Sequence, residues 1–233
     1  MLGFDRVRLE SGRFHLQADF SLPEGALVAV IGPSGAGKST LLAAVAGFQP
    51  LAGGQIRWAG TDLAGLAPGD RPVSMLFQDG NLFAHLSVAQ NVGLGLRPDL
   101  RLSPVQITQV DAALAQMGLA GMGKRRPGTL SGGQQSRVAL ARVMLQARPV
   151  LLLDEPFAAL GPALTVEMLA LVGQIATKAG TTVLMVTHHP AEALAFAPLT
   201  ILVADGVAAA PAPTADLLAN PPAALALYLG SAR

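Results

Sequence analysis

The residues from Gly32 to Ser39 have the types and the spacing of a loop that holds phosphate. They match the pattern G-x-x-x-x-G-K-[ST] at every fixed position. The glycines let backbone N–H groups approach phosphate oxygens, the lysine brings a positive charge to the β- and γ-phosphates, and the final hydroxyl is a ligand for Mg²⁺. The pattern predicts a nucleotide site but does not distinguish kinases, GTPases and transport ATPases. The expected binding residues are Gly32, Pro33, Ser34, Gly35, Ala36, Gly37, Lys38, Ser39 and Thr40.

An acidic pair, Asp154 and Glu155, directly follows the apolar run 150–153. A carboxylate at the end of a buried strand can hold Mg²⁺, usually through water, and the next one can act as a general base toward an attacking water. The alternative is an ordinary helix cap before Pro156. Because a phosphate loop is also present, we predict that Asp154 lies on the metal and that Glu155 is the catalytic base.

Two further polar residues end predicted strands. Gln78 closes the strand predicted at 72–77, where its amide could reach a metal-bound water and sense the γ-phosphate; we include it among the catalytic and the metal-binding candidates. His188 follows the strand predicted at 183–186, and its imidazole could bond to the γ-phosphate. Taken alone, each residue has an ordinary structural alternative. His189 should point to the opposite side, so a two-histidine metal site is not expected.

A second candidate anion site precedes the helix predicted at 133–146. Ser131 is a natural N-cap, and the two glycines after it leave the first N–H groups of the helix unobstructed. The alternative is a serine-capped helix without a ligand, and the residues themselves do not say which anion would bind. The candidate contacts are Ser131, Gly132, Gly133 and Gln134.

The elements that must position these residues follow an α/β pattern. Runs that are apolar throughout, alternating with helices, indicate a largely parallel sheet covered on both faces. Between about 84 and 129 apolar residues recur at helical spacing between prolines, which indicates a mainly helical insertion, and the tail from about 207 is expected to hold two short helices. Further strands are predicted at 26–31, 55–59 and 200–203, and further helices at 39–46 and from Pro162 onward.

Composition excludes several classes of protein. The chain has 233 residues, 51% of them hydrophobic and 13% charged, which is typical of a folded protein. It contains no cysteine, so disulfides, thiol nucleophiles and cysteine-based metal sites are excluded. No uninterrupted apolar run reaches 18 residues and the first residues lack an apolar signal region, so neither a membrane-spanning helix nor a signal peptide is expected. A net charge of +1 gives no reason to expect nucleic acid.

Together the motifs occur in the order and spacing of an ABC-transporter ATP-binding subunit, which the chain resembles over nearly its whole length. The resemblance implies one domain over residues 1–233: a P-loop NTPase core with a mainly parallel sheet and an N-terminal antiparallel β region. It also implies a helical subdomain inserted at about 84–131 and a short helical tail at about 207–233. ATP and Mg²⁺ are the implied cofactors. The implied assembly is a head-to-tail homodimer, in which residues 131–134 of one chain close over ATP held by Lys38 of the other.

A closer resemblance is to the ATP-binding subunits of bacterial thiamine importers. It implies that the chain binds membrane permease subunits at the cytoplasmic face of the inner membrane. An extracytoplasmic solute-binding protein would be an indirect partner, and nucleic acid is not an expected partner. Leu82, Phe83 and Leu86 would line a groove for the permease, or else be ordinary core. Two alternatives remain. The chain could energise import of iron or an amino acid, or it could be an ATP-binding regulatory module with weak turnover. The segments that carry this resemblance are 47–48, 71–78, 81–83, 88–91, 93–96, 162–164 and 167–169.

Two departures from the family pattern matter. The family usually reads Ser-Ala-Leu-Asp after the acidic pair, whereas residues 158–161 read Ala-Ala-Leu-Gly, so a polar contact across the dimer is missing at Gly161. The family also stacks an aromatic residue on adenine, and Phe14 is the candidate here. Because Lys38, Glu155 and His188 are unchanged, the resemblance still implies hydrolysis.

Overall fold

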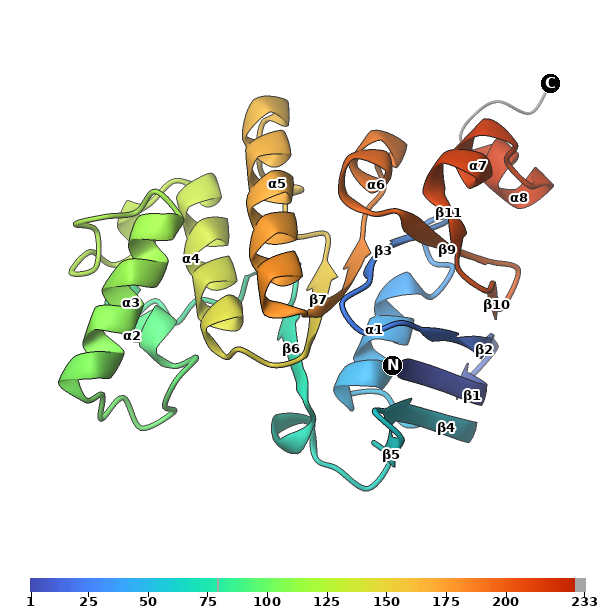
Figure 1. Cartoon of the computed structure of the whole chain (residues 1–233), viewed down its shortest axis with the longest axis horizontal. Helices are drawn as coiled ribbons and strands as arrows, with labels where there is room; N and C mark the ends of the chain where they lie inside the picture. The colour runs from blue at the N-terminus through green and yellow to red at the C-terminus, as the bar shows by residue number, and fades with distance from the viewer. Residues whose placement is uncertain (79, 229–233) are drawn as a thin grey trace.

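The computed structural model describes residues 1–78 and 80–228, and within them short apolar runs form the parallel centre of a sheet (Figure 1). In the order β9-β3-β8-β7-β6, each strand pairs in parallel with the next. Such strands need apolar residues on both sides because helices cover both faces of a parallel sheet. These strands are β3 (Leu27–Ile31), β6 (Val73–Leu76), β7 (Val150–Asp154), β8 (Thr182–Val186) and β9 (Leu199–Ala204).

The longer N-terminal strands alternate buried and exposed residues, which is typical of antiparallel strands with one face in solvent. Strand β1 pairs antiparallel with β2 and β4, and β4 pairs with β5. Strand β10 pairs with both β2 and β9, so it joins this group to the parallel centre, and β11 pairs with β9. Their bounds are β1 (Leu2–Ser11), β2 (Phe14–Leu22), β4 (Gly53–Trp58), β5 (Thr61–Asp62), β10 (Val207–Ala208) and β11 (Ala212–Pro213).

Helix α1 (Lys38–Ala46) packs in the core between the parallel centre and the antiparallel strands. Successive residues of β3 point to opposite faces of the sheet. Val28 and Val30 join the core around α1, whereas Ala29 and Ile31 join the core on the other face. Both faces of β3 are therefore fixed by packing just before the chain enters the phosphate loop.

The remaining large helices pack on the other face of the sheet, where α4, α5 and α6 stand side by side and α2 and α3 lie beyond α4 (Figure 1). Helices α2, α3 and α4 each begin with a serine N-cap and a glutamine three residues later, which together form a capping box. The helices are α2 (Val88–Gly93), α3 (Pro104–Gln116), α4 (Gly132–Leu145), α5 (Pro162–Ala179), α6 (Pro190–Phe196), α7 (Thr214–Ala219) and α8 (Ala223–Tyr228), with short 3-10 turns at Pro68–Asp70 and Pro127–Thr129.

This architecture confirms the predicted α/β class, with a parallel centre and antiparallel N-terminal strands. Helix α5 begins at Pro162 as predicted, α4 begins one residue early, and β4 begins at Gly53 rather than 55. The tail holds two short helices as expected, and also β10 and β11, which were not predicted because strands of two residues leave no repeating pattern. The bounds of an inserted subdomain stay a prediction. In the part of the chain described here, no helix has the length and hydropathy needed to cross a membrane.

Candidate active site

The predicted phosphate loop connects β3 to the first turn of α1. Gly37 is the N-cap of α1 with φ 105° and offers no side-chain cap. The first N–H groups of a helix have no intrahelical acceptor, so this end of α1 can bind an anion. At Gly32, with φ 148°, a methyl group would lie 2.0 Å from the main-chain oxygen of Val203. Only glycine fits there, so close packing against β9 sets the start of the loop.

Lys38 folds its side chain back over the loop. Its Nζ donates to the main-chain oxygens of Gly32 and Pro33, at 2.9 and 2.8 Å. Burial lowers the pKa of Lys38, while the nearby charges of Glu155 and Asp154 oppose that shift. The ammonium is therefore held over the loop, close to the two acidic side chains.

Ser39 and Asp154 come together from α1 and β7. The Ser39 hydroxyl donates to Oδ1 of Asp154 at 3.0 Å, and Asp154 is 6% exposed. Burial raises the pKa of Asp154, while the bond from Ser39 and the charge of Lys38 oppose that shift. A hydroxyl and a carboxylate side by side suit Mg²⁺, which prefers oxygen and binds with few protein ligands plus phosphate and water. Over the residues described, no cluster of three His, Cys, Asp or Glu could hold a metal without such help.

Glu155 and His188 meet at the ends of the neighbouring strands β7 and β8. Oε1 of Glu155 pairs with Nε2 of His188, and both side chains are partly buried. Glu155 has φ 48°, a left-handed conformation that is uncommon outside glycine, and its N–H donates to the Val186 oxygen at 3.2 Å. The chain therefore turns at Glu155, directly after β7, and the Glu155 carboxylate pairs with His188 at this turn. The structure thus brings the candidate base and the candidate γ-phosphate contact together.

Gln78 and Phe14 are placed less completely. Gln78 lies two residues beyond β6, where Leu76 is opposite Leu153, but its side chain is exposed. Among the described residues it has no hydrogen bond to Ser39 or Asp154, so its roles as a metal ligand and in catalysis stay predictions. The Phe14 ring packs directly on the phosphate loop, because a methyl group at Gly37 would lie 2.6 Å from its Cζ. Its contact with adenine stays a prediction.

The second candidate anion site is a capped helix start. Ser131 Oγ accepts from the Gln134 N–H at 3.3 Å, and Gln134 Oε1 accepts from the Ser131 N–H at 3.0 Å. The predicted N-cap at Ser131 is thereby confirmed. At Gly133 a methyl group would lie 2.9 Å from Cδ2 of Leu160, so a larger residue there would require the Leu160 side chain to shift. No hydrogen bond between described residues joins this segment to residues 32–40 of the same chain, so its use as an anion site stays a prediction.

Sequence reasoning missed Arg142, which ties α4 to the segment after Gln78. Its guanidinium donates to the main-chain oxygens of Gly80 at 2.8 Å and Asn81 at 2.9 Å. The fully buried Asn91 holds the same segment, because its side chain both accepts from the Phe83 N–H and donates to the Phe83 oxygen. Arg142 acts on main-chain oxygens 61 and 62 positions earlier in the chain, so no sequence pattern marks its role. Asn91 lies in the segment 88–91 of the resemblance, but its contact with Phe83 was not predicted.

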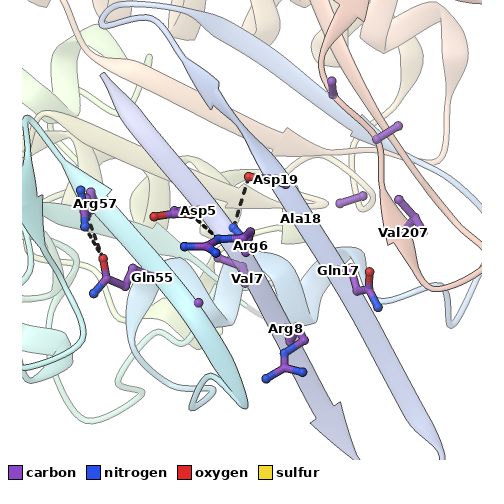
Figure 2. Close-up of a pocket in the computed structure, with 14 residues that line it drawn as sticks. Asp5, Arg6, Val7, Arg8, Gln17, Ala18, Asp19, Gln55, Arg57 and Val207 are labelled. Atoms are coloured by element: carbon purple, nitrogen blue, oxygen red, sulfur yellow. Dashed lines mark hydrogen bonds and ion pairs between the residues drawn. The ribbon is translucent and has the colours of Figure 1, made fainter.

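One hollow on the described surface lies outside this site. It has a volume of about 950 Å³ and lies over the exposed face of β1, β2, β4 and β10 (Figure 2). Among its charged side chains, Arg6 contacts Asp5 at 3.1 Å, and Arg57 donates to the neutral Gln55. It contains none of the residues predicted to carry chemistry, so the phosphate loop remains the candidate site.

Comparisons with known proteins agree with this assignment. Residues 16–158 match the family model described as ABC transporter. The thiamine import ATP-binding protein ThiQ of Cereibacter sphaeroides is 60% identical, over 99% of this chain and 100% of its own. The protein of the same name from Brucella suis is 49% identical, over 97% and 95%. Among solved structures, a dimeric post-hydrolysis state of the ATP-binding cassette MJ0796 bound to ADP and Pi has a TM-score of 0.81 at 26% identity, covering 92% of this chain and 99% of that one.

Proposed function

This chain belongs to the ABC transporter family, and on that premise we propose that it hydrolyses ATP to energise a bacterial thiamine importer. The observation that supports the ATPase activity is that the phosphate loop meets Asp154, through Ser39, beside the Glu155–His188 pair. The cargo is proposed from the relatives named for thiamine import, whose similarity extends over the whole chain.

The proposed reaction is attack of water on the γ-phosphate of ATP. The N–H groups at the start of α1 and the ammonium of Lys38 bind the phosphates. Ser39 and Asp154 would hold Mg²⁺, which supplies neutralising charge to the phosphates when bound. Glu155 accepts a proton from the attacking water, and His188 bonds to the γ-phosphate and keeps the Glu155 carboxylate in place. Gln78, two residues beyond β6, is proposed to contact the γ-phosphate from the same side of the site.

We further infer that two copies of the chain act together. The solved relative is described as dimeric, and in this chain the open helix start at residues 131–134 has no partner in its own phosphate loop among the residues described. In the proposed head-to-tail dimer, the N–H groups of Gly132 and Gly133 bind the γ-phosphate of ATP on the other copy. Gly161 is the N-cap of α5 without a side-chain cap, so the polar contact expected there across the dimer is missing.

An apolar surface near Gln78 is proposed to contact the permease. Phe83 is 48% exposed and Phe48 is 56% exposed, and the Phe48 ring lies 5.5 Å from that of Phe77. Large exposed apolar side chains mark contact sites for other proteins. Leu82 packs partly against the core, so it supports this surface from beneath. The chain would then sit on the cytoplasmic face of the inner membrane, bound to permease subunits, with a solute-binding protein on the far side.

Uptake of labelled thiamine tests the proposed cargo. Proteoliposomes that contain this chain and its permease, with ATP inside and binding protein outside, are expected to accumulate thiamine. Unlabelled thiamine should compete, whereas iron and amino acids should not. Accumulation of another solute instead would contradict thiamine as the cargo but would still support ATP-driven import. ATP binding without turnover would favour a regulatory module, the alternative for which Gly161 argues.

A further inference from the structure

The last described residue of the chain contacts the catalytic loop. Tyr228, which is the chain's one tyrosine and ends α8, donates its hydroxyl to the main-chain oxygen of His188 at 2.7 Å. Forty positions separate the two residues along the chain. Helix α8 lies on the same side of the sheet as α6, whose first turn follows His188 (Figure 1). A segment outside the nucleotide motifs is thus bonded directly to a residue of the proposed active site.

Apolar packing, rather than this bond, holds α8 against the protein. Leu225 is fully buried in the core that also contains Ala193 and Phe196 of α6, and the Tyr228 side chain packs against the same core. The side chain of Leu227, by contrast, is 73% exposed. Loss of the Tyr228 hydroxyl alone would therefore leave α8 docked through its apolar contacts.

The loop that carries His188 has few main-chain bonds of its own. Pro190 follows closely and lacks an N–H. The Thr187 hydroxyl accepts from the His189 N–H at 3.1 Å and donates to Glu192, so these contacts come from within the loop and α6. Across the described residues no backbone N–H donates to the His188 oxygen, so Tyr228 is its donor.

The phenol is suited to remain a donor at this position. Burial and the negative charge of Glu155 both raise the pKa of Tyr228 above its ordinary value. A tyrosine hydroxyl is already protonated at neutral pH, and this shift moves its titration to still higher pH.

We propose that Tyr228 is a positioning residue for hydrolysis: its bond to the His188 main chain orients the imidazole toward Glu155 and the γ-phosphate. This proposal rests on the proposed ATPase function. In this proposal, α8 affects catalysis through the main chain of the loop that carries His188. It makes no contact with ATP.

The test is hydrolysis by Tyr228→Phe in the full chain assembled with its permease. Loss of one hydrogen bond should lower kcat about three- to tenfold, with the KM for ATP and the thermal midpoint nearly unchanged. A merely structural role would lower the thermal midpoint and leave the rate of the folded protein alone. Leu227→Ala, on the same helix, is the matched control and should match the parent.

A second arm asks whether the effect passes through His188. In His188→Ala, single-turnover hydrolysis should be slow, and adding Tyr228→Phe should slow it no further, since the oriented group is gone. Effects that multiply, or a parental kcat in Tyr228→Phe, would overturn the proposal. Hydrogen exchange of amides 187–193 in the nucleotide-free chain, which should speed up in Tyr228→Phe, tests the bond even if the parent hydrolyses no ATP. Absence of turnover in the parent would instead contradict the proposed function.

Discussion

Replacing Glu155 by glutamine is expected to slow ATP hydrolysis by at least about a hundredfold while ATP still binds. A positioned general base contributes roughly 10²- to 10⁴-fold to a reaction rate. Glutamine has nearly the same shape and can still bond to His188, but it cannot accept a proton from water. The phosphate contacts of Lys38 and the start of α1 are untouched, so the Kd for ATP should stay within about twofold. Steady-state phosphate release and ATP binding by fluorescence measure the two quantities.

Glu167→Gln is the matched control for this substitution. Glu167 is an exposed carboxylate on α5, so the same loss of one charge should leave hydrolysis unchanged. If Glu155→Gln hydrolysed ATP as fast as the parent, Glu155 would not be the base. If both binding and hydrolysis were lost, the carboxylate would instead be needed to build the site.

Replacing Lys38 by alanine is expected to abolish measurable hydrolysis and to weaken ATP binding at least about tenfold. Two unit charges about 4 Å apart interact by about 4 kcal/mol in a partly buried site, which corresponds to about a thousandfold in an equilibrium or a rate. Lys38 brings such a charge to the loop, where it is 5% exposed and held by the Gly32 and Pro33 oxygens. The fall in kcat/KM should therefore approach this factor.

Lys178→Ala separates this effect from a general loss of positive charge. Lys178 is exposed in the last turn of α5, so its removal should change neither ATP affinity nor rate. Arginine at position 38 should not restore activity, because a planar guanidinium cannot replace a compact ammonium in a buried loop. Near-parental kcat/KM in Lys38→Ala would contradict the assignment of the loop.

Much of the fold could be predicted because its central strands are continuous apolar runs. Strand β7 is apolar at its first four positions and buried throughout, so its pattern admits few other interpretations. Pro162 and Ser131 mark helix starts by their own chemistry and are found there. Strand β10 could not be predicted, since two residues carry no period and its pairing with β2 is a long-range contact.

The parts of the site that are continuous sequence motifs could be predicted. The contacts between residues that are distant in the sequence could not. The loop around Lys38 and the pair Asp154–Glu155 are continuous motifs, and the structure brings them together with His188. The contact of Tyr228 with His188 could not be predicted, because it depends on how α8 docks. The metal contact of Gln78 stays a prediction, because its side chain is exposed and has no bond to Ser39 or Asp154 among the described residues.

The central claim is that ATP hydrolysis by this chain is coupled to thiamine. The most direct measurement is the ATPase rate of the chain assembled with its permease in lipid, with binding protein present, with and without thiamine. The account predicts turnover that rises several-fold when thiamine is added and that disappears in Glu155→Gln. Turnover that is the same with and without thiamine, or ATP binding with no turnover under either condition, would contradict it.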